Sequence, residues 1–370
     1  MRSDARRKPP NNRLNRSVIR IKSNLLLMTS KPLLATMRSL LVIIITVAAA
    51  IAERHSPTGP KHFIFFELQR ERIREPAFLE NQGIAGAQLK YMWRELEPER
   101  DRYAFQNVLD DVAFLEKHGK RLFVQLQDVS FSENVPVPDY LCTEPSFAGG
   151  VARQFEYEGD DESKARFAGW VARRWDPAVR GRFIKLLNEL GRVVDGKIEG
   201  LNLPETSVDF GESGKLHPAG FTYESYVASV KAIMAAARSA FPHAVVIQYA
   251  NFMPGEWLPW NDRGYLRQIY AHAESIGVGV GGPDLLPHRK GQQNHSYPLI
   301  AARSPKTVAG VAVQDDNLAD KNAATGKRVT VAELYLFATE RLRLDYIFWG
   351  TQEPYYSEAV LPYITAIPRK

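Results

Sequence analysis

Short segments rich in Val, Ile, Phe and Tyr recur along the chain, and longer segments between them repeat apolar residues every three or four positions. The first pattern is typical of buried strands and the second of amphipathic helices. Eight strand–helix units within residues 61–367 predict a single α/β domain, a (β/α)8 (TIM) barrel. An open doubly wound sheet is the alternative, although no Gly-x-Gly-x-x-Gly sequence follows the first strand. The predicted strands are 63–68, 86–92, 121–127, 197–203, 244–250, 277–281, 309–314 and 344–349.

Capping residues mark two of the predicted helices. Asp176 followed by Pro177 begins a helix over 176–194, because aspartate accepts hydrogen bonds from the free N–H groups of the first turn. Thr330 precedes a helix predicted over 331–342 and is suited to the same role. The segment 128–175 shows neither pattern, so we expect a long loop that forms one wall of a cleft. Two further helices are predicted over 107–118 and 223–241.

An apolar run over residues 40–49 is followed by small residues that end at Ala52. A bilayer span needs roughly 20 apolar residues, so the run favours a signal peptide cleaved near Ala52 over a membrane anchor. Residues 1–52 are therefore predicted to be an N-terminal extension with its signal peptide, whether translation starts at Met1 or Met37. The barrel would then be exported, either to the periplasm or as a secreted protein.

The charge is concentrated at the N-terminus. The chain has 48 basic and 42 acidic side chains and a net charge of +6. Ten basic and one acidic side chain lie in residues 1–52, a net charge of +9, so the remainder carries −3. A mildly acidic body argues against nucleic-acid binding.

Cysteine and histidine usage limits the possible chemistry. The single Cys142 excludes an internal disulfide framework. Asp284, His288 and His295 are the one candidate metal set, but their loop is rich in Lys and Arg, and no His-x-His or His-Glu-x-x-His sequence occurs. We therefore predict no metal or other cofactor, no nucleic-acid partner, and no stable membrane span after signal cleavage.

Polar residues interrupt most of the predicted strands. Barrel strands are buried on both faces, so a polar side chain inside one is expected to face the lumen rather than the helices. Amide side chains both donate and accept hydrogen bonds, which suits sugar hydroxyls. A polar ligand at the carboxyl ends of the strands, with carbohydrate as the partner, explains the set better than packing alone. Its members are Glu67, Gln88, Lys90, Gln125, Gln127, Asn202, Gln248 and Gln314.

Acidic residues follow four of the strands. Barrel chemistry lies at the carboxyl ends of the strands, and a pair of carboxyl groups there can cleave a glycosidic bond. Capping of the following helix is the alternative role, and it is weakest for Glu205, which directly follows a proline. Strand alternation places Asp316 on the lumen side if Gln314 faces the lumen. The same alternation would turn Glu205 away from Asn202 unless Pro204 marks a bulge. The other acids are Asp284, Asp315 and Glu353.

A motif near residue 100 resembles the second βα unit of barrel glycoside hydrolases of the β-galactosidase and endoglucanase clan. It consists of Trp93, Glu97, Pro98, Tyr103, Phe105 and Asp110, and Asp101 stands where that clan usually has glycine. In that clan the acid/base is a Glu directly after an Asn on strand 4, and the nucleophile is a Glu on strand 7. Here Leu203 and Pro204 separate Asn202 from Glu205, and strand 7 offers aspartates. The resemblance implies Glu205 as acid/base and, less directly, Asp316 as nucleophile.

We therefore expect an exported glycosidase that acts by a two-carboxylate, retaining mechanism, with catalytic Glu205 and Asp316. Asp284, Asp315 and Glu353 remain alternatives for the second carboxylate. A catalytically silent barrel that binds a polysaccharide of an exopolysaccharide or cell-wall system is the alternative function. The predicted substrate contacts, which include tryptophan rings able to stack on sugars, are Glu67, Lys90, Gln127, Asn202, Gln248, Asn251, Trp257, Asp284, Gln314, Trp349 and Glu353.

Overall fold

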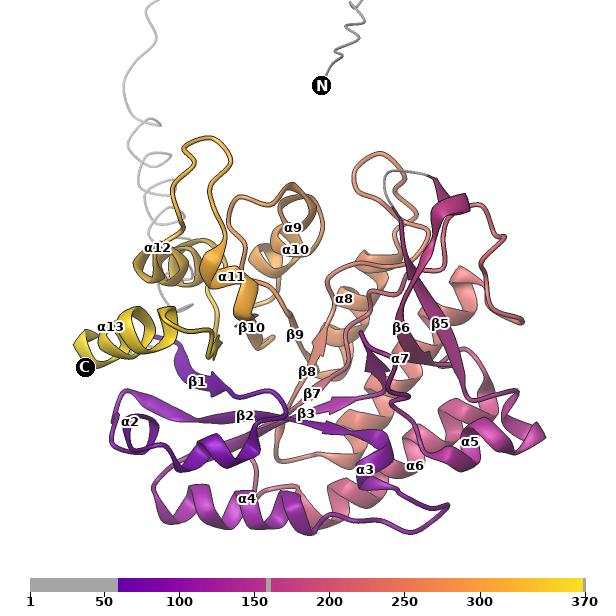
Figure 1. The fold of residues 1–370 in the computed structure, drawn as a ribbon, viewed down its shortest axis with the longest axis horizontal. Helices are drawn as coiled ribbons and strands as arrows, with labels where there is room; N and C mark the ends of the chain where they lie inside the picture. Colours follow the sequence, from indigo (N-terminus) through magenta and orange to yellow (C-terminus); the bar gives the residue numbers. More distant parts are fainter. Residues whose placement is uncertain (1–58, 158–160, 369–370) are drawn as a thin grey trace, which may run out of the picture. The chain divides into compact units, whose positions relative to one another are not determined.

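Eight parallel strands close into a barrel in the computed structural model of the protein (Figure 1). Residues 59–157 and 161–368 are described, so the predicted signal peptide lies outside the described residues. The strand order around the barrel is β1-β11-β10-β9-β8-β7-β3-β2, and all eight predicted strands are found in it. The strands are β1 (Lys61–Phe65), β2 (Ile84–Met92), β3 (Arg121–Gln127), β7 (Gly200–Leu203), β8 (Val245–Tyr249), β9 (Gly279–Gly282), β10 (Ala309–Val313) and β11 (Tyr346–Gly350).

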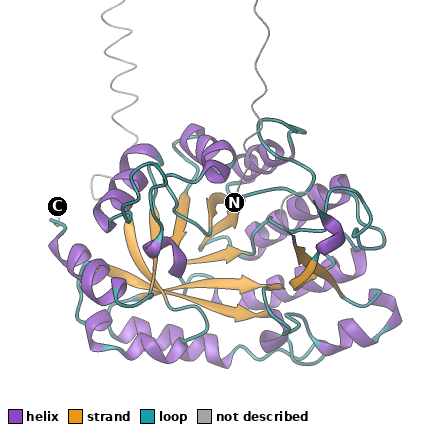
Figure 2. Ribbon diagram, turned by 45° about the horizontal axis from the view of Figure 1, so that its top comes forward, coloured by secondary structure: helices purple, strands orange, loops and turns teal. Residues whose placement is uncertain are grey.

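Helices lie outside the ring of strands (Figure 2). They are α2 (Pro76–Leu79), α3 (Trp93–Leu96), α4 (Gln106–Lys117), α5 (Asp139–Thr143), α6 (Pro177–Val194), α7 (Tyr223–Ala240), α8 (Tyr265–Ile276), α9 (Lys290–Asn294), α10 (Ser296–Ala302), α11 (Asp315–Ala319), α12 (Val331–Leu336) and α13 (Leu361–Ala366). Shorter turns are η1 (Arg70–Arg74), η2 (Pro145–Phe147), η3 (Glu162–Lys164), η4 (Phe337–Arg341) and η5 (Tyr356–Val360).

Both predicted helix caps are confirmed. The Asp176 carboxylate accepts hydrogen bonds from the N–H groups of Ala178 and Val179, at 2.8 and 3.2 Å. Thr330 caps α12 through the N–H of Glu333. The helix predicted over 331–342 is shorter than expected, because its second half continues as the wider π-helical turn η4.

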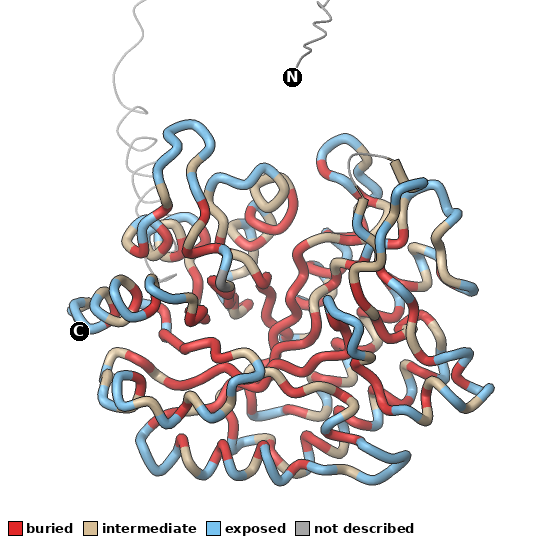
Figure 3. The backbone as a smooth tube through the Cα atoms, viewed as in Figure 1, coloured by how far each residue is buried: buried red, intermediate tan, exposed pale blue. Residues whose placement is uncertain are grey.

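Aromatic rings pack the barrel interior. Phe63, Phe123 and Phe348 have no exposed surface, and their ring centroids lie 4.9–5.9 Å apart. A neighbouring strand makes room with Gly200, where a Cβ atom would lie 2.4 Å from the Phe123 ring. Figure 3 shows the strands as largely buried backbone. Because the lumen is filled with side chains, a ligand has to bind where the strands end.

The segment 128–175 is more ordered than the long loop expected from its sequence. It contributes an antiparallel sheet with the order β4-β6-β5, from β4 (Val129–Ser130), β5 (Val151–Glu156) and β6 (Arg166–Ala172). Gly169 in β6 has φ of 137°, and its Cα approaches the Ser130 backbone so closely that a Cβ would lie 2.0 Å from the carbonyl oxygen. The short strands lack the apolar alternation by which they would have been recognised.

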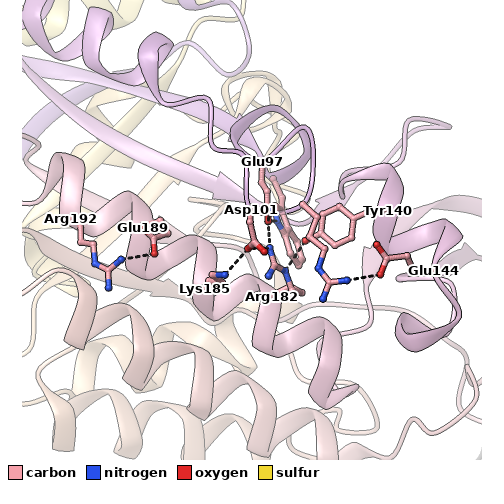
Figure 4. A network of polar contacts seen from close by, with 10 residues as sticks. Glu97, Asp101, Tyr140, Glu144, Arg182, Lys185, Glu189 and Arg192 are labelled. Carbon is pink, nitrogen blue, oxygen red and sulfur yellow. Dashed lines mark hydrogen bonds and ion pairs between the residues drawn. The ribbon is translucent and has the colours of Figure 1, made fainter.

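The motif near residue 100 forms a polar network that ties the β2–α4 connection to α6 (Figure 4). Glu97 is fully buried, accepts a hydrogen bond from Trp93 Nε1 at 2.9 Å, and pairs with Arg182. Asp101 has φ of 62°, a left-handed conformation that glycine adopts more readily than other residues. Its carboxylate binds Lys185 at 2.6 Å and Arg182 at 2.8 Å, and these contacts lower its pKa to about 2. This part of the motif therefore has a structural role.

Candidate active site

Glu205 follows β7 and lies among polar groups of neighbouring strands. Its Oε2 accepts a 2.6 Å hydrogen bond from Nδ2 of Asn251, which follows β8. Burial raises the pKa of Glu205 to about 7, assisted by the negative charge of Asp284 and opposed by the Asn251 hydrogen bond and by the Arg174 and Lys90 charges. A carboxyl group with this pKa is partly protonated at neutral pH and can act as a general acid.

Asp284 follows β9 and is the carboxyl group that interacts electrostatically with Glu205. Its Oδ1 accepts hydrogen bonds from Nδ2 of Asn317 at 3.1 Å and from Nε2 of Gln314 at 3.3 Å. Burial raises the pKa of Asp284, whereas these two amide donors lower it. The negative charge of Asp284 adds to burial in keeping Glu205 protonated.

A buried ion pair holds the backbone at Glu205. Arg174 contacts Asp128 with two nitrogens, one of them at 2.8 Å, and both residues are almost wholly buried. The same guanidinium donates to the carbonyl oxygen of Glu205 at 2.7 Å and to the Tyr226 hydroxyl at 2.8 Å. Tyr226 in turn donates to the carbonyl of Thr206. Segments far apart in the sequence thereby set the direction of the chain as it leaves β7.

Glu67 and Lys90 lie beside each other near the carboxyl ends of β1 and β2. Glu67 follows β1 with φ of 54°, and its Oε1 lies 3.5 Å from Nζ of Lys90. Lys90 and Gln127 both line a cavity of about 490 Å³ at the carboxyl ends of β2 and β3. The Lys90 charge reaches Glu205, because it lowers the pKa of that carboxyl. One residue that lines the cavity, Lys90, is therefore within electrostatic reach of Glu205.

Gln88 and Asn202 face the lumen, as the register of their strands requires. Gln88 Nε2 donates to Asn202 Oδ1 and to the Tyr249 hydroxyl, both at 3.1 Å. Gln88 and Asn202 have no exposed surface. Asn202 therefore lies buried in the lumen, and its contact with a ligand stays a prediction. Gln125, paired in register with Asn202, is buried on the same side.

Two predicted substrate contacts face the helices instead of the lumen. Gln248 is buried on the outer side of β8, where its amide donates to the carbonyl of Pro204 at 2.6 Å. Trp349 is fully buried, and its Nε1 donates at 2.9 Å to Nδ1 of His62, whose pKa is lowered to about 4 by burial. The predictions for Gln248 and Trp349 were wrong in orientation, because the register of the closed barrel turned these side chains outward.

Strand alternation also failed for Asp316 and Glu205, for a different reason. β10 ends at Val313 and α11 begins at Asp315, so the period-two pattern does not reach Asp316. Asp316 is exposed, and its charge acts on Asp284. β7 likewise ends at Leu203, so Glu205 reaches the site without a bulge in the strand.

Glu353 lies between β11 and η5 and binds the first turn of η5. It is exposed, and its Oε2 accepts hydrogen bonds from the N–H and hydroxyl of Ser357 at 3.2 and 2.6 Å. Two other predicted contacts lie in the site. Asn251 donates a hydrogen bond to Glu205, and Gln314 donates one to Asp284.

Trp257 lies in the loop after β8 with 47% of its surface exposed. Its ring stacks on Phe252, with an interplanar angle of 7° and centroids 5.7 Å apart. His295 packs against both rings, and its Nε2 accepts from the N–H of Leu258 at 2.9 Å. The tryptophan is thus held in one orientation at the rim, as a sugar-stacking ring should be.

Sequence reasoning missed Asp128, Arg174 and Asn317. Asp128 directly follows β3, so the rule that selected the other strand-end acids would have found it. Arg174 carried no local signal, because its partner Asp128 is 46 residues away in the chain. Asn317 donates to Asp284 across 33 positions, which no local pattern reveals.

Within the described ranges, no group of three or more His, Cys, Asp or Glu side chains is arranged to hold a metal ion. None of the helices in those ranges has both the length and the apolar character needed to cross a bilayer.

No protein-family model and no curated protein matches the sequence. Among solved structures, the catalytic domain of β-amylase from Paenibacillus polymyxa gives a TM-score of 0.54 at 7% identity, covering 79% of this chain and 92% of that chain. The β-galactosidase from Bacillus circulans sp. alkalophilus gives a TM-score of 0.51 at 11% identity, covering 80% of this chain and 50% of that chain. A GH5_18 variant from Streptomyces cattleya, in complex with Manβ1-4GlcNAc, gives a TM-score of 0.50 at 15% identity, covering 80% of this chain and 70% of that chain. The expected likeness to (β/α)8 glycoside hydrolases is therefore confirmed for the fold.

Proposed function

We propose that the protein is a glycoside hydrolase that cleaves O-glycosidic bonds of an oligo- or polysaccharide, with Glu205 as general acid and Asp284 as the second carboxylate. The observation that carries the proposal is the pair itself. The two carboxyl groups follow β7 and β9, on either side of β8; the charge of Asp284 acts on Glu205, whose pKa is about 7. Such a pair supplies both a proton for the leaving oxygen and a negative charge for the anomeric carbon.

The assignment of roles follows from the hydrogen bonds. Glu205 receives one amide hydrogen bond, whereas Asp284 receives two, which favour its ionised form. Glu205 is therefore the group that is protonated near neutral pH and donates its proton to the departing oxygen. Asp284 is preferred over Asp316 because the Asp284 charge acts directly on Glu205, whereas Asp316 is exposed and acts on Asp284.

The second carboxylate either attacks the anomeric carbon or activates a water molecule. A nucleophile requires carboxyl groups roughly 5–5.5 Å apart, and a base requires roughly 6.5–9.5 Å. We expect retention, with Asp284 as nucleophile. Proton NMR of the first-formed product tests this, because release of the inverted anomer would assign Asp284 the role of base.

Variants with different leaving groups test the acid assignment. Glu205→Gln is expected to slow hydrolysis of methyl glycosides by about 10²–10⁴-fold, because the leaving alkoxide needs a proton. Dinitrophenyl glycosides should lose far less, since their leaving group departs without one. Asp284→Asn should slow both. Glu116→Gln, on the exposed side of α4, is the control and should retain activity.

Equal loss of kcat/KM, which reports the step that releases the leaving group, on both substrates in Glu205→Gln would remove Glu205 from the acid role. Sugar binding without turnover by the wild-type protein would refute the hydrolase proposal and favour a silent barrel.

We also propose that the protein acts outside the cytoplasm, because residues 40–52 have the layout of a signal peptide. Expression with and without residues 1–52, followed by fractionation and N-terminal sequencing, tests this. Cytoplasmic retention of the uncleaved full chain would contradict it.

A further inference from the structure

Binding surfaces suited to sugars lie on both sides of Glu205 in the order of the strands. One is the cavity of about 490 Å³ over β2 and β3. Its lining includes Leu68, Lys90, Gln127, Ser130, Phe131 and Asn134. The lining combines apolar and polar side chains, which suits a pyranose ring with its apolar C–H face and its hydroxyl edge.

Gln127 gives the cavity a built polar contact. Its side chain is 9% exposed, and its Oε1 has no hydrogen-bond partner among the described residues. A buried carbonyl oxygen without a partner costs free energy, which a donating hydroxyl group of a ligand would recover. At the rim of the same cavity, Phe131 is 68% exposed and Leu68 is 56% exposed.

The second surface is the Trp257 ring on the loop after β8. Its orientation is set by stacking on Phe252, and Phe252 directly follows Asn251, the residue that binds Glu205. The platform and the carboxyl group are therefore supported by the same short segment. Nearly half of the Trp257 surface remains exposed for stacking.

The strand order places the carboxyl group between these two surfaces. β7, which leads to Glu205, is hydrogen-bonded to β3 on one side and to β8 on the other (Figure 1). The cavity lies over β2 and β3, and Trp257 lies beyond β8. A saccharide chain that occupies both surfaces passes the carboxyl end of β7, and so passes Glu205 at an internal linkage.

We propose that the substrate is a polysaccharide cleaved internally, with sugar units bound in the Gln127 cavity on one side of the scissile bond and against Trp257 on the other. This inference rests on the hydrolase activity proposed above and adds the endo mode of action. In the reaction, the anomeric C–O bond breaks, water supplies hydroxyl and proton, and two shorter saccharide chains are released.

The test follows product size during early hydrolysis of carboxymethylcellulose, galactomannan, arabinoxylan and a soluble β-glucan, beside a panel of aryl monosaccharide glycosides. Internal cleavage releases fragments of intermediate length and lowers viscosity steeply for each new reducing end. Turnover of aryl glycosides with only mono- or disaccharides released from the polymers would overturn the inference and leave the hydrolase proposal standing. Absence of all turnover would overturn both.

Two single variants test the two surfaces separately. Phe131→Ala and Trp257→Ala are each expected to raise KM for the hydrolysed polymer about five- to tenfold, with a smaller change for aryl monosaccharides. Trp257→Phe keeps a stacking ring and should recover most of the loss, which distinguishes stacking from disruption of the loop. Leu336→Ala, at a site 50% exposed on α12, is the control and should leave KM unchanged. A polymer KM unchanged in either aromatic variant would overturn binding on that side.

Discussion

Replacing Glu205 by glutamine is expected to stabilise the folded protein at neutral and alkaline pH. The pKa of Glu205 rises from an ordinary 4.5 to about 7 on folding. Between these values the folded state keeps a proton that the unfolded state has lost, so the free energy of unfolding falls as pH rises. At 1.36 kcal/mol per tenfold change, and allowing for partial exposure, the loss is about 2–3 kcal/mol. Glutamine does not titrate, so the variant avoids this loss of stability, and its side-chain oxygen can still accept the hydrogen bond from Asn251.

Urea unfolding of wild type and Glu205→Gln at pH 5 and pH 8 measures the effect. The variant should gain about 2–3 kcal/mol relative to wild type between the two conditions, because only the wild type loses stability through the Glu205 titration. Glu116→Gln, on the exposed side of α4, controls for the substitution itself. A difference between variant and wild type that is the same at both pH values would refute the reasoning.

Three further variants test the surroundings of the site and the core. Asn251→Ala removes a hydrogen bond that lowers the pKa of Glu205, so the alkaline limb of kcat/KM should move up by about one pH unit; a downward shift would contradict the general-acid role. Asp128→Asn leaves buried Arg174 without its counter-charge and should cost about 3–5 kcal/mol in urea unfolding; wild-type stability would show that the pair is not needed. Phe123→Ala should cost about 3–5 kcal/mol in the same assay, because the ring is fully buried among aromatic neighbours; a loss below 1 kcal/mol would mean that the barrel interior repacks.

Local sequence was sufficient for the elements and for much of the chemistry. Apolar runs identify buried strands because burial on both faces selects them, and Asp176 and Thr330 identify helix starts because capping involves residues two or three positions apart. Glu205 was identified because an acid directly after a buried strand has few structural roles. The fold class and one member of the carboxyl pair are thus local properties of the chain.

The tertiary structure decided which side each strand residue faces and which groups meet at the mouth. Gln248 and Trp349 turn toward the helices because strand register is set by closure of the whole barrel. The charge of Asp284, and not that of Asp316, acts on Glu205. The prediction for Asp316 relied on strand alternation, which stops where β10 ends. The Arg174–Asp128 pair that orients Glu205 joins residues 46 positions apart. Such contacts depend on the path of the folded chain, and a linear pattern carries no information about that path.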